Sequence, residues 1–434
     1  MKKTSFLIFL LGAAALPAKV TLSQAVADAW KISPALRGQQ LEEQAAATAR
    51  LTALRQKYFS LAFSGSYRYT SDKVEVTVAD FPFPLAPGIA PGTTVLSAPN
   101  ASVDMKLALQ QPIYNGGVLD NAVKAEALRA AAEQHLTRLK KIELAGKVKN
   151  AFFSHRLFCK KRAALNSLLA RLTLHQGRLE NLHREGLVRR SDLLEAMAKA
   201  DEVRLNLEDL EQLIRSEALH FSTLCGHDPQ DIEPPAARAG ESYAAAQEFF
   251  LASHPLLRAL DQRLRLARLQ KKTIAGSYLP QVNAFAELHY GRPGQNFFAS
   301  RWTPYVAGGV SVSMPVFNWN RNGRDQSLAD IAASKLELQR TDFVRESEKN
   351  LRQLFFHRES LGKKLSLLEG LAANAAENAG LKERLYEENQ VDHSDYLAAL
   401  TDSERYASMR EEFLAQVELL EVGILTVIGK CEEE

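Results

Sequence analysis

Two seven-residue segments, LQQPIYN at residues 109–115 and VSMPVFN at residues 312–318, decide how this chain is organised. Their prolines are 315 − 112 = 203 positions apart. The same shift carries Phe152-Phe153 onto Phe355-Phe356, and Gly226 onto Gly429. A shift that stays constant over more than 110 positions indicates an internal duplication. Each half of the chain is therefore expected to form one structural unit.

Nearer the N-terminus the two halves align at a larger shift. SPALR at residues 33–37 matches HPLLR at 254–258, where the prolines differ by 255 − 34 = 221. The change of shift falls between residues 70 and 100, a Pro- and Gly-rich stretch that is expected to be an inserted loop. The sequence predicts a signal peptide over 1–18, a first repeat over 19–238 and a second over 239–434. Each repeat is expected to hold a helix, a β-hairpin and long helices, over 60–111 and 118–226 in the first and over 279–314 and 321–429 in the second.

Four segments that flank the loops alternate between apolar and polar residues: 61–69, 102–110, 281–290 and 306–314. In the second of them Val103, Met105 and Leu107 point one way, while Asp104 and Lys106 point the other. Strands of about ten residues with this period are typical of membrane β-barrels, although a half-buried soluble sheet shows the same alternation. Four strands cannot close a barrel, and an open sheet edge is not tolerated in lipid. A barrel would therefore need several copies of the chain.

The stretch from 118 to 184 carries apolar residues at helical spacing, such as Leu136, Leu139 and Ile142. As one helix it would be about 100 Å long, at about 1.5 Å per residue. The alternative is two or three shorter helices stacked in a bundle. The chain is expected to turn at Gly186, and at its counterpart Asn389, because Gly and Asn most readily adopt the left-handed conformation that ends a helix.

Return helices are predicted to follow these turns, with Ser191 and Ser394 as N-caps. Asp192 and Asp395 then lie in a first helical turn, where a carboxylate is favourable. Two interpretations of these carboxylates remain open: they only cap the helices, or they also serve a function.

Composition excludes several classes of protein. MKK at residues 1–3, an apolar run over 6–11 and small residues over 13–18 are typical of a secretory signal peptide. No later apolar stretch reaches the roughly 20 residues of a spanning helix. The net charge is +3 with both signs mixed, which gives no support for a nucleic-acid partner. The three cysteines suit neither a disulfide framework nor a zinc site, and DHSD at 392–395 lies outside any catalytic motif, so neither an enzyme nor a cofactor is expected.

Three motifs carry a family resemblance: PIYNGG at 112–117, REGLV with SDLLEA at 184–188 and 191–196, and the segment 386–399. They resemble the TolC-like outer-membrane efflux protein family, the outer-membrane component of tripartite efflux and type I secretion systems. The resemblance implies a mainly α protein with a membrane β-barrel: a homotrimer with twelve strands and a long periplasmic α-helical barrel. It also implies a location in the bacterial outer membrane, extending into the periplasm, and partners that are a periplasmic adaptor, an inner-membrane pump and outer-membrane lipid.

The resemblance assigns site residues as well. It implies a periplasmic gate at Asp395, Asp192 and Tyr386, where Ala398 replaces a further carboxylate of the family. It implies turn or adaptor-docking residues, and hinges between strand and helix. The docking residues are Gly186, Leu187, Val188, Arg189, Asn389, Gln390 and Val391, and the hinges are Pro112, Gly116, Gly117 and Pro315. The hypothesis from a different class is an exported, water-soluble helical scaffold or coiled-coil interaction protein.

Overall fold

The computed structural model describes residues 20–431 apart from 73, 78–93, 234, 236–239 and 389. The predicted signal peptide, most of the predicted loop and Asn389 therefore lie outside the described residues. The chain divides into two compact units. Unit 1 comprises the described parts of Met1–Leu41, His135–Arg258 and Arg340–Glu434, and unit 2 comprises Glu42–Gln134 and Ala259–Gln339. Each unit takes residues from both sequence repeats.

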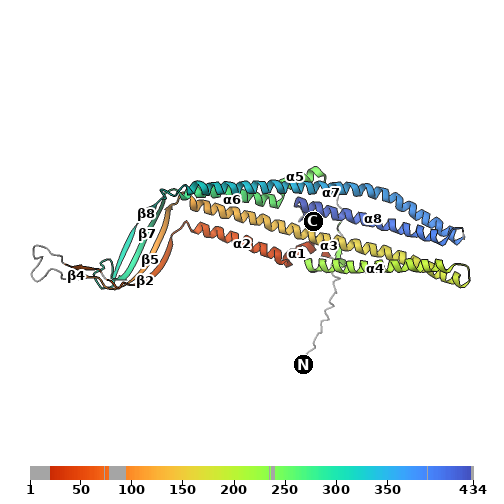
Figure 1. Cartoon of the computed structure of the whole chain (residues 1–434), viewed down its shortest axis with the longest axis horizontal. Helices are drawn as coiled ribbons and strands as arrows, with labels where there is room; N and C mark the ends of the chain where they lie inside the picture. Colours follow the sequence, from red (N-terminus) through yellow and green to blue (C-terminus); the bar gives the residue numbers. More distant parts are fainter. Residues whose placement is uncertain are drawn as a thin grey trace, which may run out of the picture. The chain divides into compact units, whose positions relative to one another are not determined.

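Unit 2 contains a four-stranded antiparallel sheet in the order β2-β5-β7-β8 (Figure 1). Strands β2 (Ser60–Tyr69) and β5 (Ala101–Tyr114) come from the first repeat, and β7 (Gln281–Arg292) and β8 (Thr303–Ser313) from the second. The four predicted strands are thus confirmed. Pairing between β5 and β7 joins the two repeats into one sheet, which the sequence alone did not predict.

The register places the apolar side chains of all four strands on one face. Leu109 is opposite Leu61 on one side and Ala286 on the other, and Leu288 is opposite Val306. Because side chains alternate along a strand, the polar residues share the other face. Phe285 is the exception on that polar face. It lies opposite Gly309, where a Cβ would be 3.2 Å from the Phe285 ring, so the ring covers the bare glycine backbone.

A two-stranded ribbon extends unit 2. Strands β3 (Glu75–Thr77) and β4 (Thr94–Ser97) pair antiparallel, with a register shift after Val76. Helices α2 (Pro34–Arg55) and α6 (Pro255–Ser277) begin at the two prolines that are related by the shift of 221. Proline suits the first turn of a helix, because the N–H that it lacks would have no partner there.

The long helices repeat with the shift read from the sequence. Helices α3 (Val118–Arg184) and α7 (Arg321–Glu387) have 67 residues each, and 321 − 118 = 387 − 184 = 203. Helices α4 (Arg190–Cys225) and α8 (His393–Ile428) have 36 residues each and obey the same shift. Both shorter helices end at a left-handed glycine, Gly226 or Gly429. Residues 118–184 form one continuous helix, so the alternative of shorter stacked helices is wrong.

Unit 1 has its main core where α1 (Leu22–Ile32) packs on α3 and α4. Thr21 and Gln24 form a reciprocal capping box that fixes the start of α1. Strand β1 (Val20–Thr21) pairs with β6 (Ile232–Glu233), after the short helix η1 (Pro229–Asp231). Helix α5 (Tyr243–Ser253) contributes a second cluster with α7 and α8.

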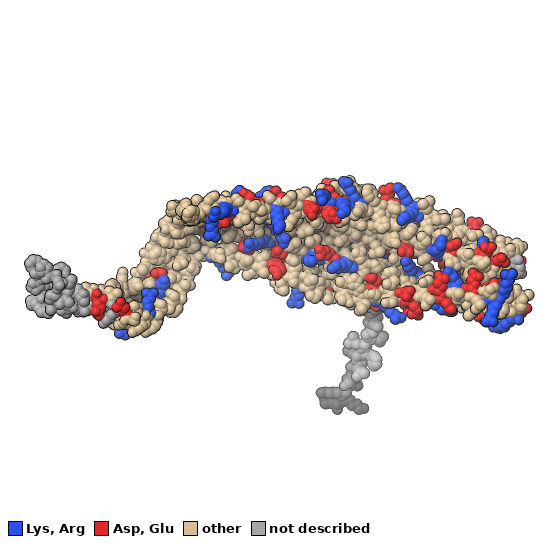
Figure 2. Space-filling view, viewed as in Figure 1, with Lys and Arg blue, Asp and Glu red and all other residues tan. Residues whose placement is uncertain are grey.

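The surface carries charges of both signs, as the composition predicts. Figure 2 shows Lys and Arg interspersed with Asp and Glu along the helices, with no broad field of one sign on the face drawn. Within the described part of the chain, every helix is too short or too polar to cross a bilayer. All three cysteines are free, and Cys225 and Cys431 are buried among core residues.

Candidate functional site

The turn between α3 and α4 is a Schellman motif in unit 1. Gly186 has a φ of 75°, as its place at the helix end predicts. The Leu187 N–H donates to the Leu182 carbonyl at 2.9 Å, and the Gly186 N–H donates to the His183 carbonyl at 3.0 Å. These bonds satisfy the last carbonyls of α3. Leu187 is 69% exposed at this turn. We call α3 with α4 the first helical hairpin, and α7 with α8 the second.

The turn between α7 and α8 repeats the longer-range of these two bonds. The Gln390 N–H donates to the Leu385 carbonyl at 2.8 Å, 203 positions after the equivalent bond of the first turn. Asn389 itself lies outside the described residues. Arg189 and Gln390 are exposed, whereas Val188 and Val391 are partly buried. The predicted docking residues that the structure describes therefore lie at the two turns, and their role in docking stays a prediction.

The two return helices begin earlier than the sequence predicts. Helix α4 has Arg189 as its N-cap residue, and α8 has Asp392, neither with a side-chain cap bond. Ser191 and Ser394 are second residues of their helices, so their assignment as N-caps is wrong. The Ser191 hydroxyl donates instead to Asp192 at 3.0 Å. In both helices the helical backbone already includes the residue before the serine, Arg190 or His393.

The three predicted gate residues divide into two places. Asp395 is 63% exposed at its side chain, and its carboxylate lies 3.6 Å from the Lys382 ammonium on α7. Tyr386 is partly buried, and its pKa is raised by burial and then by the negative charge of Asp192. The structure thus associates Asp192 with Tyr386 across the two hairpins, and pairs Asp395 with a lysine of its own hairpin. Both carboxylates lie in a first helical turn, as expected.

Beside Tyr386 lies a cluster of rings that sequence reasoning missed. His175 of α3 and His393 of α8 are stacked, with ring centroids 4.8 Å apart and 8° between their planes. His175 Nε2 lies 2.8 Å from His393 Nδ1, so one ring donates a hydrogen bond to the other. Tyr386 and Tyr396 are stacked on each other and meet His175 edge-on. We call these four residues the ring cluster; it joins the first hairpin to the second.

The two histidines favour the neutral state in this setting. They are 4% and 7% exposed. Burial lowers the pKa of His175 to about 4, with further contributions from His393 and Arg178. Burial also lowers the pKa of His393, against the opposing effect of Glu195 and Asp192. The Nε2 atom of His393 is buried without a hydrogen-bond partner among the described residues.

Ion pairs continue this contact along α3 and α8. Arg156 pairs with Glu418, Lys160 with Glu411, Lys161 with Glu412 and Arg171 with Glu404, at 2.9 to 3.4 Å. At the end nearest the turns, Arg178 of α3 pairs with Glu387 of α7 at 3.3 Å. Exposed pairs contribute little each, so the buried contact between the hairpins near the turns consists of the ring cluster and an adjoining apolar cluster that includes Leu172 of α3 and Leu397 and Leu400 of α8.

The predicted hinge residues lie where the sheet of unit 2 meets the long helices. Gly116 and Gly117 have φ values of 61° and 78°, and their counterparts Trp319 and Asn320 also have positive φ, both 53°. A Cβ on Gly116 would overlap the carbonyl oxygen of Gly276, so close approach as well as conformation requires glycine there. The backbone between strand and helix therefore adopts positive φ in both repeats, but only the first repeat has glycines at these positions.

The two predicted hinge prolines differ in position. Pro112 lies inside β5 and pairs with Asn283, and the register shifts between it and Tyr114. The strand therefore extends three residues beyond the expected hairpin end at 111. The repeat symmetry is broken here, because Pro315 lies after the end of β8 at Ser313. Proline cannot donate to a ladder, which explains the shift of register beside Pro112.

A network of charges occupies the polar face of the sheet. His289 lies between Asp104, at 3.1 Å from Nδ1, and Glu287, at 3.2 Å from Nε2. Lys106 donates to Glu287 at 3.0 Å, and Tyr305 is stacked on His289. Carboxylates only accept hydrogen bonds, so the two ring nitrogens of His289 each face an acceptor. The network thus places Lys106 and His289 beside the carboxylates of Asp104 and Glu287.

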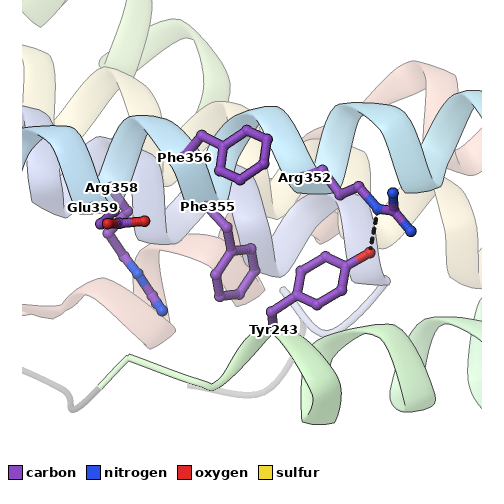
Figure 3. Close-up of a pocket in the computed structure, with 6 residues that line it drawn as sticks. All are labelled: Tyr243, Arg352, Phe355, Phe356, Arg358 and Glu359. Carbon is purple, nitrogen blue, oxygen red and sulfur yellow. Dashed lines mark hydrogen bonds between the residues drawn. The ribbon is translucent and has the colours of Figure 1, made fainter.

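A cavity of about 640 Å³ lies between the start of α5 and α7 (Figure 3). The Nε atom of Arg352 donates to the Tyr243 hydroxyl at 3.0 Å, and Tyr243 meets Phe355 edge-on. Arg358 donates to Glu421 and to the Glu241 carbonyl, and Glu359 accepts from Lys363. Arg352, Arg358 and Glu359 are thus all bound to other residues of the protein. Their contacts help to hold α5 against α7, and none of the three lies free in the cavity to act as an acid or a base. Among the described residues no cluster of His, Cys, Asp and Glu could hold a metal ion.

Comparison with known proteins decides the family. The model of the family described as outer membrane efflux protein matches residues 25–227 and 248–418. The chain belongs to the outer membrane efflux protein family. It is an outer-membrane channel of an efflux system with a periplasmic extension, in a family of channels rather than enzymes. No curated protein matches the chain.

Solved structures of low sequence identity share this fold. The outer membrane protein VceC from Vibrio cholerae is 16% identical, with a TM-score of 0.76 over 94% of this chain and 96% of its own. A membrane protein from Pseudomonas aeruginosa is 17% identical, with a TM-score of 0.77 over 95% and 91%. The MtrE outer membrane channel of Neisseria gonorrhoeae, solved in its open state, is 15% identical, with a TM-score of 0.71 over 98% and 94%. The architecture is therefore kept although most side chains differ.

Proposed function

We propose that three copies of this chain form one passive conduit, in which their sheets close a twelve-stranded barrel. The argument is the open sheet. Strands β2 and β8 are its edges, and each has a neighbour on one side only. An open edge in lipid leaves backbone N–H and C=O groups without partners, at a cost of several kcal/mol per group. Pairing β2 of one copy with β8 of the next satisfies both edges.

The number of strands supports a trimer. Two copies would supply eight strands, and a barrel of that size is filled by its own side chains. Three copies supply twelve, which leaves space for a lumen. The apolar face would then meet lipid, and the Asp104–His289–Glu287–Lys106 network would line the lumen. Exposed apolar side chains on β2 and β8 fit this arrangement, among them Phe63, Tyr67, Val306 and Val310.

The long helices carry exposed apolar residues that fit lateral packing between copies. Helix α4 exposes Leu194, Leu205 and Leu219, and α7 exposes Leu338 and Leu367. Fully burying one leucine side chain is worth roughly 1.5–3 kcal/mol, so rows of them support a stable helical barrel. The family resemblance implies the same periplasmic arrangement.

The gate is proposed at the helix turns. Movement of the α7–α8 hairpin away from the α3–α4 hairpin would widen the periplasmic mouth, as one packing of the helices replaces another. Tyr386 and Asp192 lie at the contact between the hairpins, and three copies of Asp395 would surround one axis. The conduit itself supplies no energy, which would come from a partner pump.

The partners are proposed from the family resemblance and the exposed turns. A periplasmic adaptor would bind Gly186, Leu187, Val188 and Arg189 on one turn, and Asn389, Gln390 and Val391 on the other. The adaptor would connect the channel to an inner-membrane pump in tripartite efflux or type I secretion. Cysteines at Arg189 or Gln390, in a Cys159→Ser background, should crosslink to the adaptor. A cysteine at the exposed His357, away from the turns, is the matched control.

The channel proposal is tested on the exported protein. The chain should sediment with outer membrane, migrate as a trimer that dissociates on boiling, and conduct ions in planar bilayers. A monomer that stays in solution without detergent would overturn the proposal and favour the exported scaffold. A trimer in the outer membrane that never conducts ions would overturn the proposed conduit function but would still support the proposed trimeric assembly.

A further inference from the structure

The contact between His175 and His393 has a chemistry that depends on protons. The 2.8 Å separation allows one N–H between the rings. With one added proton the bond can persist as a shared N–H, but the charge is buried. With two added protons both nitrogens carry hydrogen, and two N–H groups of like charge face each other. That arrangement cannot hold at 2.8 Å, so full protonation breaks the contact.

The contact lies beside the α7–α8 turn and joins the two helical hairpins. His393 is the first residue of α8, directly after the α7–α8 turn, and His175 lies on α3 of the other hairpin. The rings of Tyr386 and Tyr396 enclose the pair. Separation of the two hairpins must therefore break the contact between the histidines. Conversely, loss of the contact weakens the buried link between the hairpins near the turns, where only the apolar cluster around Leu172, Leu397 and Leu400 then remains.

Charged residues near the two histidines affect their protonation through electrostatic interaction at a distance. On α3, Arg178 disfavours protonation of His175, and Arg171 lies nearby. On α4, Asp192 and Glu195 favour protonation of His393, but burial outweighs them. On α7, Glu383 and Glu387 act on Tyr396 of α8 in the same cluster. Arg171 and Arg178 are themselves paired with Glu404 and Glu387.

Protons can reach the pair through a hollow between the helices. A cavity of about 570 Å³ is lined by His175 and Tyr396 together with the charged residues Arg171, Arg178, Glu383 and Glu404. A polar cavity of this size holds water, which can carry protons to a buried ring. The pair is thus shielded from bulk solvent but not isolated from it.

The pair occurs once in each chain. The shift of 203 places Asn378 at the equivalent of His175, and Arg190 at the equivalent of His393. Neither residue changes its charge in the range where histidine titrates. The duplicated hairpins are therefore unequal, because the histidine pair has no titrating counterpart at the equivalent positions.

We propose that the His175–His393 contact is a pH-sensitive switch, which holds the two hairpins together at neutral pH and releases the α7–α8 hairpin on acidification. The inference rests on the proposed gate at the helix turns, and gives that gate a specific signal, the proton concentration of the periplasm. In a trimer the three switches would act at the same level of the conduit.

The test measures the distance between the hairpins directly. Spin labels are attached at Leu187→Cys and Gln390→Cys in a background that carries Cys159→Ser, Cys225→Ala and Cys431→Ala. Dipolar spectroscopy on the purified protein in detergent should show a longer distance on acidification, with a midpoint between about pH 6.5 and about pH 4. Circular dichroism and thermal unfolding check that each variant folds.

The deciding variant is His175→Gln with His393→Asn. The glutamine amide can occupy the place of Nε2 and the asparagine amide that of Nδ1, so a neutral hydrogen bond remains possible. All carboxylates near the pair are kept, so their titration is still present. The distance should no longer change with pH in this variant. The matched control is His220→Gln on the exposed face of α4, which should respond as the wild type does.

Two results would overturn the switch: a wild-type distance that does not change with pH, or a Gln/Asn variant that changes as the wild type does. If the Gln/Asn variant does not fold, His175→Phe with His393→Phe replaces it, because two stacked rings without titratable nitrogens make the same prediction. Bilayer conductance is recorded separately. A chain that forms no pore but shows the pH-dependent distance would refute the conduit and keep the switch.

Discussion

The Nε2 atom of His175 lies 2.8 Å from the Nδ1 atom of His393, although the two residues are 218 positions apart in the chain. Stacked rings, low exposure and a buried Nε2 without a described partner all favour the neutral pair. The first prediction follows from the pKa of His175.

The wild type should lose stability relative to His175→Gln with His393→Asn as the pH falls. Burial lowers the pKa of His175 to about 4, below its value of about 6.5 in an unfolded chain. Between these values the unfolded state binds more protons than the folded state, so stability rises with pH and is lost on acidification. The loss should reach about 3 kcal/mol near pH 4, where one pKa unit corresponds to about 1.4 kcal/mol. Thermal unfolding in detergent over a pH series measures it, and parallel curves for the two proteins would contradict it.

Asp395→Ala should raise single-channel conductance less than twofold, but weaken block by divalent cations. Three copies of a carboxylate around one axis attract cations, and their removal leaves a weaker site. Lys382→Gln is the matched change, because it removes the ammonium 3.6 Å from Asp395 and should strengthen the block. Both are measured by bilayer recording with and without divalent salt. Unchanged block in Asp395→Ala would remove Asp395 from the gate.

Lysine substitutions at two neighbouring positions of β8 should show which face of the sheet meets lipid and which meets the lumen. Val306→Lys places a charge on the apolar face, at a cost of about 2–4 kcal/mol near the bilayer midplane. Ala307→Lys places the same charge on the polar face, opposite Glu287, where water can solvate it. The boiling-sensitive trimer should be lost or weakened for Val306→Lys only. Equal loss for both variants would contradict the proposed orientation of the sheet.

Gly116→Ala should destabilise the protein more than Gly117→Ala. Both residues have positive φ, which alone costs a side chain roughly 1–2 kcal/mol. A Cβ at Gly117 meets open space, whereas one at Gly116 overlaps the Gly276 carbonyl, so backbone must also move. Chemical or thermal unfolding of the two variants measures the difference. Equal destabilisation would mean that conformation alone, not the close approach of Gly276, requires glycine at position 116.

Local patterns in the sequence determined the elements of this protein. Alternation gave the four strands, helical spacing gave α3, and a shift of 203 related both pairs of long helices, residue for residue. The left-handed turn at Gly186 was also predictable, because few residues tolerate positive φ. Each of these features depends on residues close together in the chain.

The tertiary structure decided what these elements bring together. Pairing of β5 with β7 joins the repeats, and no local pattern specifies which strands become neighbours. Ser191 and Ser394 looked like N-caps, but the helices begin one residue before each serine, so residue type alone did not locate the helix starts. His175 and His393 meet only because α3 and α8 pack together, and burial between those helices changes the proton affinity of residues that look ordinary in the sequence.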